Sequence, residues 1–121
     1  MSTRAVYQFF NRAENDKVLF YKHHDGYPDG WFGALERIKS VVVLGAFDDL
    51  KVIKKVMLDI GAEELRDEME ADRADQQHRY NVRLDDGQVT LTHYDRHGDK
   101  DKSHYILTAD GWKQRWMDEV V

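Results

Sequence analysis

Residues 79–94 read RYNVRLDDGQVTLTHY and form the most regular pattern in the chain. From Tyr80 to Leu84, apolar and polar residues alternate, which is the period of a strand with one buried face. Asp85-Asp86-Gly87 then supplies turn residues that tolerate a positive φ. The alternation returns and continues to Tyr94, so this stretch predicts a β-hairpin.

Further strand segments lie on both sides of this hairpin. Residues 4–10 and 17–23 are rich in Val, Tyr and Phe, and the polar residues between them indicate a loop. Together they predict another hairpin near the N-terminus. Residues 104–107 can add one more strand after the second hairpin.

Apolar residues at helical spacing predict the helices. The spacing over residues 31–42 predicts the first helix, and that over residues 50–60 predicts the second, with Asp48 available as its N-cap. An acidic helical turn or two follows through residues 65–69. Apolar residues within 112–120 have the spacing of a last helix.

The order of these elements predicts an α+β domain. We expect an antiparallel sheet built from the two hairpins plus the added strand, with two or three helices packed on one face. Single strands do not alternate with helices, so no parallel sheet is expected. The chain has neither an internal repeat nor a linker rich in Pro, Gly or Ser, which predicts a single domain over residues 1–121.

The composition restricts the class of protein. Of 121 residues, 41% are hydrophobic and 34% are charged, and none is cysteine. A disulfide framework, a cysteine nucleophile and cysteine-ligated zinc or iron are therefore excluded, and we expect a cytoplasmic protein. No apolar run is long enough for a signal peptide or a membrane span. The net charge of -5 argues against direct binding to nucleic acid but does not exclude a small anionic ligand.

One motif stands out, the segment HHDGYPDG at residues 23–30. Its glycines permit a positive φ and its proline restricts the residue before it, which predicts a sharp turn between a strand and the first helix. Asp29 can cap that helix, whose N-terminal N–H groups attract anions. The candidate ligand-binding residues around this turn are Arg4, His23, His24, Asp25 and Tyr27. Alternatively, the segment is only a tight strand-to-helix connection.

The N-terminal quarter of the chain resembles known proteins. It begins with Ser2-Thr3-Arg4-Ala5, continues with the predicted hairpin and reaches the string His23-His24-Asp25-Gly26-Tyr27-Pro28. In these features it resembles small phage and prophage proteins, among them the Thoeris anti-defence proteins, which sequester signalling nucleotides of the cyclic ADP-ribose type. The resemblance implies a non-catalytic sponge for such a nucleotide. The chain departs from it at Trp31-Phe32, where those proteins tend to carry small residues.

A second candidate site lies on the hairpin of residues 79–94. Arg79 and Arg83 share the polar side of its first strand, and Tyr94 ends its second strand. Arginine offers a planar fork for phosphate, and a tyrosine ring can stack on a base. Alternatively, these residues form a cross-strand charge pattern on an exposed sheet face.

No residue set indicates catalysis or a cofactor. The three serines lie outside any nucleophile elbow, and the chain has neither a P-loop nor a GxGxxG motif. His93 and His97 are four positions apart, but in a strand and its following loop this spacing does not bring both rings to one face. We therefore expect no catalytic residues, no metal and no cofactor.

These observations predict a phage or prophage protein that sequesters a small anionic nucleotide without turnover, as a homo-oligomer in the host cytoplasm. The alternative starts from the acidic stretch of residues 63–75. It is an acidic protein–protein inhibitor of a host defence nuclease or nucleic-acid-binding complex, similar to anti-CRISPR proteins. The acidic stretch can also be a plain solvated helix face, which leaves a housekeeping domain as a third hypothesis.

Overall fold

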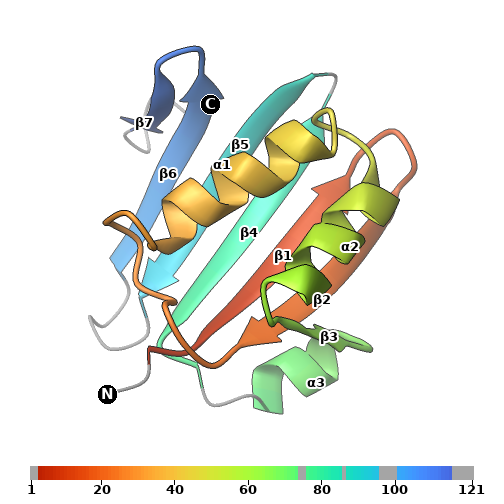
Figure 1. The fold of residues 1–121 in the computed structure, drawn as a ribbon, viewed down its shortest axis with the longest axis vertical. Helices are drawn as coiled ribbons and strands as arrows, with labels where there is room; N and C mark the ends of the chain where they lie inside the picture. Colours follow the sequence, from red (N-terminus) through yellow and green to blue (C-terminus); the bar gives the residue numbers. More distant parts are fainter. Residues whose placement is uncertain (1–2, 74–75, 86, 96–100, 116–121) are drawn as a thin grey trace.

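The computed structural model describes residues 3–73, 76–85, 87–95 and 101–115, which form one sheet and three helices (Figure 1). The strands are β1 (Ala5–Asn11), β2 (Asp16–Lys22), β3 (Glu63–Leu65), β4 (His78–Asp85), β5 (Gln88–Asp95), β6 (Asp101–Thr108) and β7 (Gly111–Arg115), and the helices are α1 (Ala34–Leu44), α2 (Leu50–Asp59) and α3 (Glu68–Arg73). The strand order in this seven-stranded sheet is β3-β2-β1-β4-β5-β6-β7. The predicted α+β class is therefore confirmed, with more strands than the sequence indicated.

Both predicted hairpins are present. β1 pairs with β2 and β4 pairs with β5, in each case antiparallel. In the second hairpin, Gly87 has a φ of 80°, which the Asp-Asp-Gly turn was expected to require. The buried residues of β4 are Tyr80, Val82 and Leu84, as the alternation predicts.

The centre of the sheet differs from the prediction. β1 and β4 pair in parallel, with Ala5 opposite His78, so the sheet is not wholly antiparallel. The reason is that α1, α2, β3 and α3 together form the connection between the two hairpins and return the chain to the end of the sheet where β1 begins. A parallel neighbour needs such a long crossover.

The predicted last helix is also wrong over its described part. Residues 111–115 form β7, in which Trp112 lies opposite Leu107 of β6. The Thr108 hydroxyl donates to the Gly111 carbonyl at 2.8 Å, and Gly111 has a φ of 110°, so a tight turn reverses the chain here. Residues 116–120 of the predicted helix lie outside the described residues.

The acidic segment after α2 is a short strand followed by a helix. Gly61, with a φ of 91°, ends α2, and β3 then pairs with β2. The Asp67 carboxylate accepts the N–H of Glu70 at the start of α3. A small second cluster of buried residues forms here: Val6, Leu19, Leu65 and Ala71. Because Val6 and Leu19 alternate along their strands with residues of the main core, α3 packs on the opposite face of the sheet from α1 and α2.

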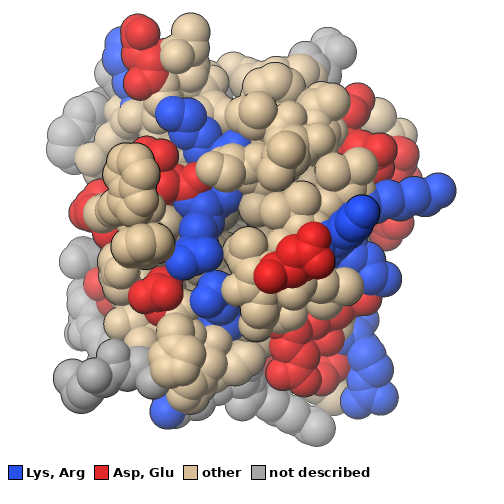
Figure 2. Space-filling model, viewed as in Figure 1, with Lys and Arg blue, Asp and Glu red and all other residues tan. Residues whose placement is uncertain are grey.

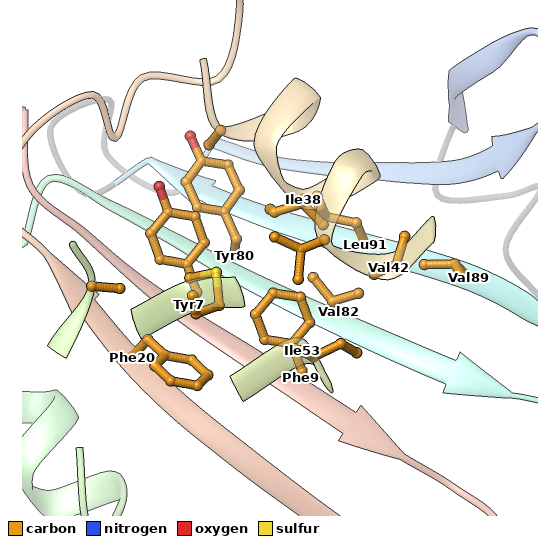
Figure 3. Close-up of a cluster of buried hydrophobic side chains, with 14 of the residues drawn as sticks. Tyr7, Phe9, Phe20, Ile38, Val42, Ile53, Tyr80, Val82, Val89 and Leu91 are labelled. Atoms are coloured by element: carbon orange, nitrogen blue, oxygen red, sulfur yellow. The ribbon is translucent and has the colours of Figure 1, made fainter. Parts of the chain in front are cut away.

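The main core lies between the sheet and helices α1 and α2, which cross the same face (Figure 1). Figure 3 shows Ile38 of α1 above Val82 and Leu91, and Ile53 of α2 beside Phe9. The Tyr7 and Tyr80 rings stack with centroids 5.3 Å apart, and the Tyr80 and His93 rings with centroids 4.7 Å apart. An aromatic row therefore runs across the three central strands.

His93 ends this aromatic row and is buried. Its Nε2 lies 2.8 Å from Nδ1 of His78, which is a hydrogen bond between two imidazoles. Burial and the neighbouring His78 lower the pKa of His93 from 6.5 to about 4. In the folded protein the His93 side chain is therefore neutral near pH 7.

Acidification should destabilise the protein through this residue. Between pH 4 and 6.5 the unfolded chain protonates His93 while the folded chain does not. The stability that neutral His93 contributes is complete above the unfolded-state pKa and is lost as the pH falls toward the folded-state pKa. Urea unfolding should give a free energy of unfolding lower at about pH 5 than at about pH 7.5, with His93 contributing on the order of 1–2 kcal/mol.

The matched variant is His93→Gln, which keeps a hydrogen-bonding side chain but cannot titrate. It should lose less stability than the wild type over the same pH interval, since the remaining titrating groups are common to both proteins. Equal losses in the two proteins would show that His93 is not responsible.

Candidate functional site

The connection between β2 and α1 is fixed to the sheet at Gly26. Its N–H donates to the Thr3 carbonyl at 2.9 Å, and its carbonyl accepts from the buried Tyr80 hydroxyl at 2.6 Å. A Cβ at Gly26 would lie 2.7 Å from the Thr3 oxygen and 2.8 Å from the Ala5 Cβ. Close packing against β1 therefore requires glycine at this position.

The N-terminus of α1 is less open to an anion than the sequence predicts. The helix begins at Ala34, and no side chain caps it, so the prediction that Asp29 is the cap is wrong. The N–H groups of Ala34 and Leu35 donate to the carbonyls of Tyr27 and Pro28, at 2.7 and 3.1 Å. The chain itself thus satisfies two of the N–H groups that an anion would need.

Four of the predicted loop residues lie next to one another. The exposed rings of His23 and His24 have centroids 4.7 Å apart, and His23 Nδ1 lies 3.0 Å from the Tyr21 hydroxyl. The Tyr27 hydroxyl donates to Asp25 at 3.4 Å. These contacts hold the loop in shape.

Arg4, the fifth predicted residue, touches the loop through its backbone. Its carbonyl carbon would be 3.0 Å from a Cβ at Gly26, and its carbonyl oxygen accepts the N–H groups of Gln77 and His78. The structure therefore places Arg4 where β1, β4 and the loop meet.

A partly buried polar cluster lies beneath this loop. Lys22 Nζ donates to the His24 carbonyl at 3.3 Å, and Arg37 pairs with Asp25 at 3.4 Å. Burial and the nearby Arg37 lower the pKa of Lys22. The Tyr7 hydroxyl is buried without a hydrogen-bond partner among the described residues, and burial raises its pKa. The cluster fixes the loop onto the helix-covered face of the sheet.

The second predicted set, Arg79, Arg83 and Tyr94, lies on the other face of the sheet. Arg79 Nη2 donates to both carboxylate oxygens of Glu68, at 2.9 and 2.8 Å, which is a charge-assisted contact. The Arg83 guanidinium lies 5.6 Å from the centroid of the Phe10 ring. Asp25 of the loop lies on the helix-covered face, where it pairs with Arg37, whereas His23 contacts Tyr21, whose ring packs against the second cluster on the face of α3. The structure therefore divides the loop candidates between the two faces of the sheet.

Three carboxylates of the acidic stretch, Glu64, Glu68 and Glu70, pair with basic side chains. Glu64 lies 2.9 Å from Lys54, and Glu70 lies 3.3 Å from Arg66. Although burial would raise the pKa of Glu68, hydrogen bonds from Arg79 and Lys17 hold it below its usual value. These ion pairs reduce the net charge of the surface and fit a solvated face with internal pairing.

A pocket of about 500 Å³ lies where the loop, α1 and the β6–β7 turn meet. We call it the turn pocket, and its polar and aromatic lining consists of Asp29, Trp31, Glu36, Lys39, Asp110 and Trp112. The Trp112 indole N–H donates to the Leu35 carbonyl at 2.7 Å, which fixes this wall. Trp31 is 87% exposed, so its ring is free to contact a ligand.

The turn pocket unites two copies of the tripeptide Asp-Gly-Trp, at residues 29–31 and 110–112. In both copies the glycine has a positive φ, 101° at Gly30 and 110° at Gly111. Sequence reasoning missed this pocket because it assigned each tryptophan to a buried helical face. The repeated tripeptide was the available signal, since glycine before a tryptophan allows the backbone to turn and leave the ring at the surface.

Comparison with known proteins does not assign the chain to a family. The chain matches no protein-family model, and neither the curated proteins nor the solved structures include a match. Within the described residues, no three His, Asp or Glu side chains are grouped so that they could hold a metal ion. Nor is any described helix long and apolar enough to cross a bilayer.

Replacing Gly26 with alanine should destabilise the protein. The new Cβ would overlap the backbone of β1, and overpacking of this kind typically costs about 1–3 kcal/mol. Thermal or urea unfolding measures the loss. His24→Ala, in the same loop but at an exposed position, should change the stability by no more than about 0.5 kcal/mol. A Gly26→Ala protein as stable as the His24→Ala protein would contradict the packing role of this glycine.

Proposed function

We propose that this protein binds a small anionic nucleotide in the turn pocket and sequesters it without turnover, as a phage or prophage protein that counteracts host defence. The observation that supports the proposal is the meeting of two Asp-Gly-Trp tripeptides around one pocket. The resemblance of the N-terminal quarter to nucleotide-sequestering proteins favours the same class of ligand. The volume of about 500 Å³ lies within the range of small-molecule sites, roughly 300–1,000 Å³.

The side chains of the turn pocket suit the three parts of a nucleotide. The exposed Trp31 ring can stack on a base, since every base has a π face. The Lys39 ammonium can attract a phosphate as a point charge. The carboxylates of Asp29 and Asp110 can accept hydrogen bonds from ribose hydroxyls, as acidic residues do in dinucleotide-binding folds.

The charge of the turn pocket limits the ligand. Asp29, Glu36 and Asp110 supply three carboxylates against the single ammonium of Lys39. A triphosphate would meet repulsion there, so a cyclic nucleotide or a monophosphate is favoured. On the same face, Lys and Arg atoms form a band over the middle of the molecule, with Asp and Glu atoms beside it (Figure 2).

The walls of the turn pocket are fixed by internal contacts. One tripeptide follows the loop anchored at Gly26, and the other lies in the turn held by the Thr108 hydroxyl. The Trp112 hydrogen bond to α1 joins the two walls. A site ordered before binding loses less conformational entropy when the ligand enters, which favours the high affinity that sequestration needs.

The alternative proposal, an acidic inhibitor of a host nuclease or nucleic-acid-binding complex, has less support. Its surface would be the acidic stretch, where Glu64, Glu68 and Glu70 are already paired with basic side chains. Those pairs would have to be exchanged for contacts with the partner. Salt-sensitive capture of a basic host protein would favour this alternative.

Isothermal titration with cyclic ADP-ribose isomers, cyclic dinucleotides, AMP and ATP tests the turn pocket. We expect a cyclic nucleotide or AMP to bind more tightly than ATP. Lys39→Met should weaken the best ligand by about 10- to 100-fold, because it removes a charge-assisted contact of about 1.5–3 kcal/mol. Trp31→Ala should weaken it through lost stacking.

Lys55→Met is the matched control, since it removes an equal charge from an exposed position of α2 outside the pocket. It should bind like the wild type. His24→Ala separates the two sites: a loss of affinity in His24→Ala, with none in Lys39→Met, would move the ligand to the loop histidines.

The bound nucleotide should be recovered unchanged. After prolonged incubation and heat denaturation of the protein, chromatography should return the compound that was added. A hydrolysed or ring-opened product that forms with the wild type, and not with Lys39→Met, would show that the pocket is an active site.

A further inference from the structure

An apolar groove of about 470 Å³ runs between α1 and α2 on the side that faces away from the sheet. We call it the interhelical groove. Its apolar lining consists of Trp31, Phe32, Val41, Leu44, Val56 and Ile60. It is distinct from the turn pocket, although Trp31 and Glu36 border both.

The side chains beside the interhelical groove are unusually exposed for apolar residues. Phe32 is 59% exposed and Leu44 is 61% exposed, and Val43 continues the exposed surface along α1. The opposite side of α1 already packs Ile38 and Val42 into the core, so the exposed residues contribute little to the stability of a single copy. A continuous apolar patch of this kind marks an interaction surface.

We infer that this surface joins two copies of the chain around a two-fold axis, with Phe32 of each copy seated in the interhelical groove of the other. Phe32 lines the groove and is 59% exposed, so the side chain to be inserted and the hollow lie on one face. A two-fold contact requires such a self-complementary patch, because the same surface meets itself. This inference does not rest on the proposed nucleotide site.

The charges around the groove permit this contact. The polar lining is Glu36, Arg37 and Ser40, one carboxylate and one guanidinium, so two copies would meet with no net charge at the centre. Figure 2 views this face and shows uncharged surface over much of α1 and α2, beside the basic band. The excess negative charge of the chain lies elsewhere, for example along β3 and α3.

The exposed apolar area is a substantial part of an interface. Without Trp31, which borders the turn pocket, Phe32, Val43 and Leu44 expose roughly 300 Å² of largely apolar surface, given about 150–250 Å² for a whole aromatic side chain. The half-buried Val56 and Ile60 and the polar groove residues add to this, against the roughly 800 Å² per partner that a stable interface buries. The uncovered sheet face is a weaker candidate because Thr90, Thr92 and Arg83 make it polar.

Sedimentation velocity of the full chain, from about 1 to 100 µM, tests the inference. The wild type should be a dimer at the upper concentrations. Leu44→Glu and Phe32→Glu should each be monomeric or weaken the dimer by at least about tenfold, because a buried carboxylate would enter the groove. Both positions are exposed in one copy, so circular dichroism should show a folded monomer.

Met69→Glu is the matched control, since Met69 is 62% exposed but lies on α3, away from the groove. It should remain as dimeric as the wild type. A wild type that stays monomeric at about 100 µM would overturn the inference, as would groove variants that are as dimeric as the wild type. Loss of the dimer in Met69→Glu as well would overturn the location of the interface.

Discussion

The hydrogen bond from the buried Tyr80 hydroxyl to the Gly26 carbonyl is the constraint on which the rest of the structure depends. A buried hydroxyl without a hydrogen-bond partner lowers the stability of the folded state, so this bond holds the loop at a fixed distance from β4. The packing of Gly26 against Thr3 and Ala5 leaves no space for another position. The loop in turn sets where α1 begins, and α1 supplies one wall each of the turn pocket and the interhelical groove.

The HHDGYPDG segment thus acts mainly through its backbone. Its carbonyls satisfy the first N–H groups of α1, and the side chains of His23, Asp25 and Tyr27 contact Tyr21, Arg37 or one another. Its contribution to a binding site is the tripeptide at its end, Asp29 to Trp31, which it carries to the β6–β7 turn. A motif can therefore be important for a site while its most distinctive side chains, the two histidines, lie outside it.

What the sequence predicts correctly is local. The hairpin of β4 and β5 follows from a period-two pattern and an Asp-Asp-Gly turn, both contained in one short stretch. The parallel pairing of β1 with β4 joins segments that are distant in the sequence, and the residue pattern of neither strand indicates it. The spacing of Trp112, Trp116 and Val120 predicts a helix, whereas the turn held by the Thr108 hydroxyl places Trp112 in a strand. The turn pocket also depends on contacts between distant segments, since one wall comes from residues 28–39 and the other from residues 110–112. Local sequence patterns do not predict such contacts.

The parallel pairing also governs how the chain reaches this structure. Ala5 can pair with His78 only after the ribosome has synthesised α1, α2, β3 and α3. Contacts between residues so distant in the sequence slow folding. Until then the first hairpin has an open edge at β1 and an apolar face without its helices. An unpaired edge of this kind is the part of a nascent chain most prone to aggregate. An inner strand of the finished sheet, β1, therefore keeps an unprotected edge until β4 has been synthesised.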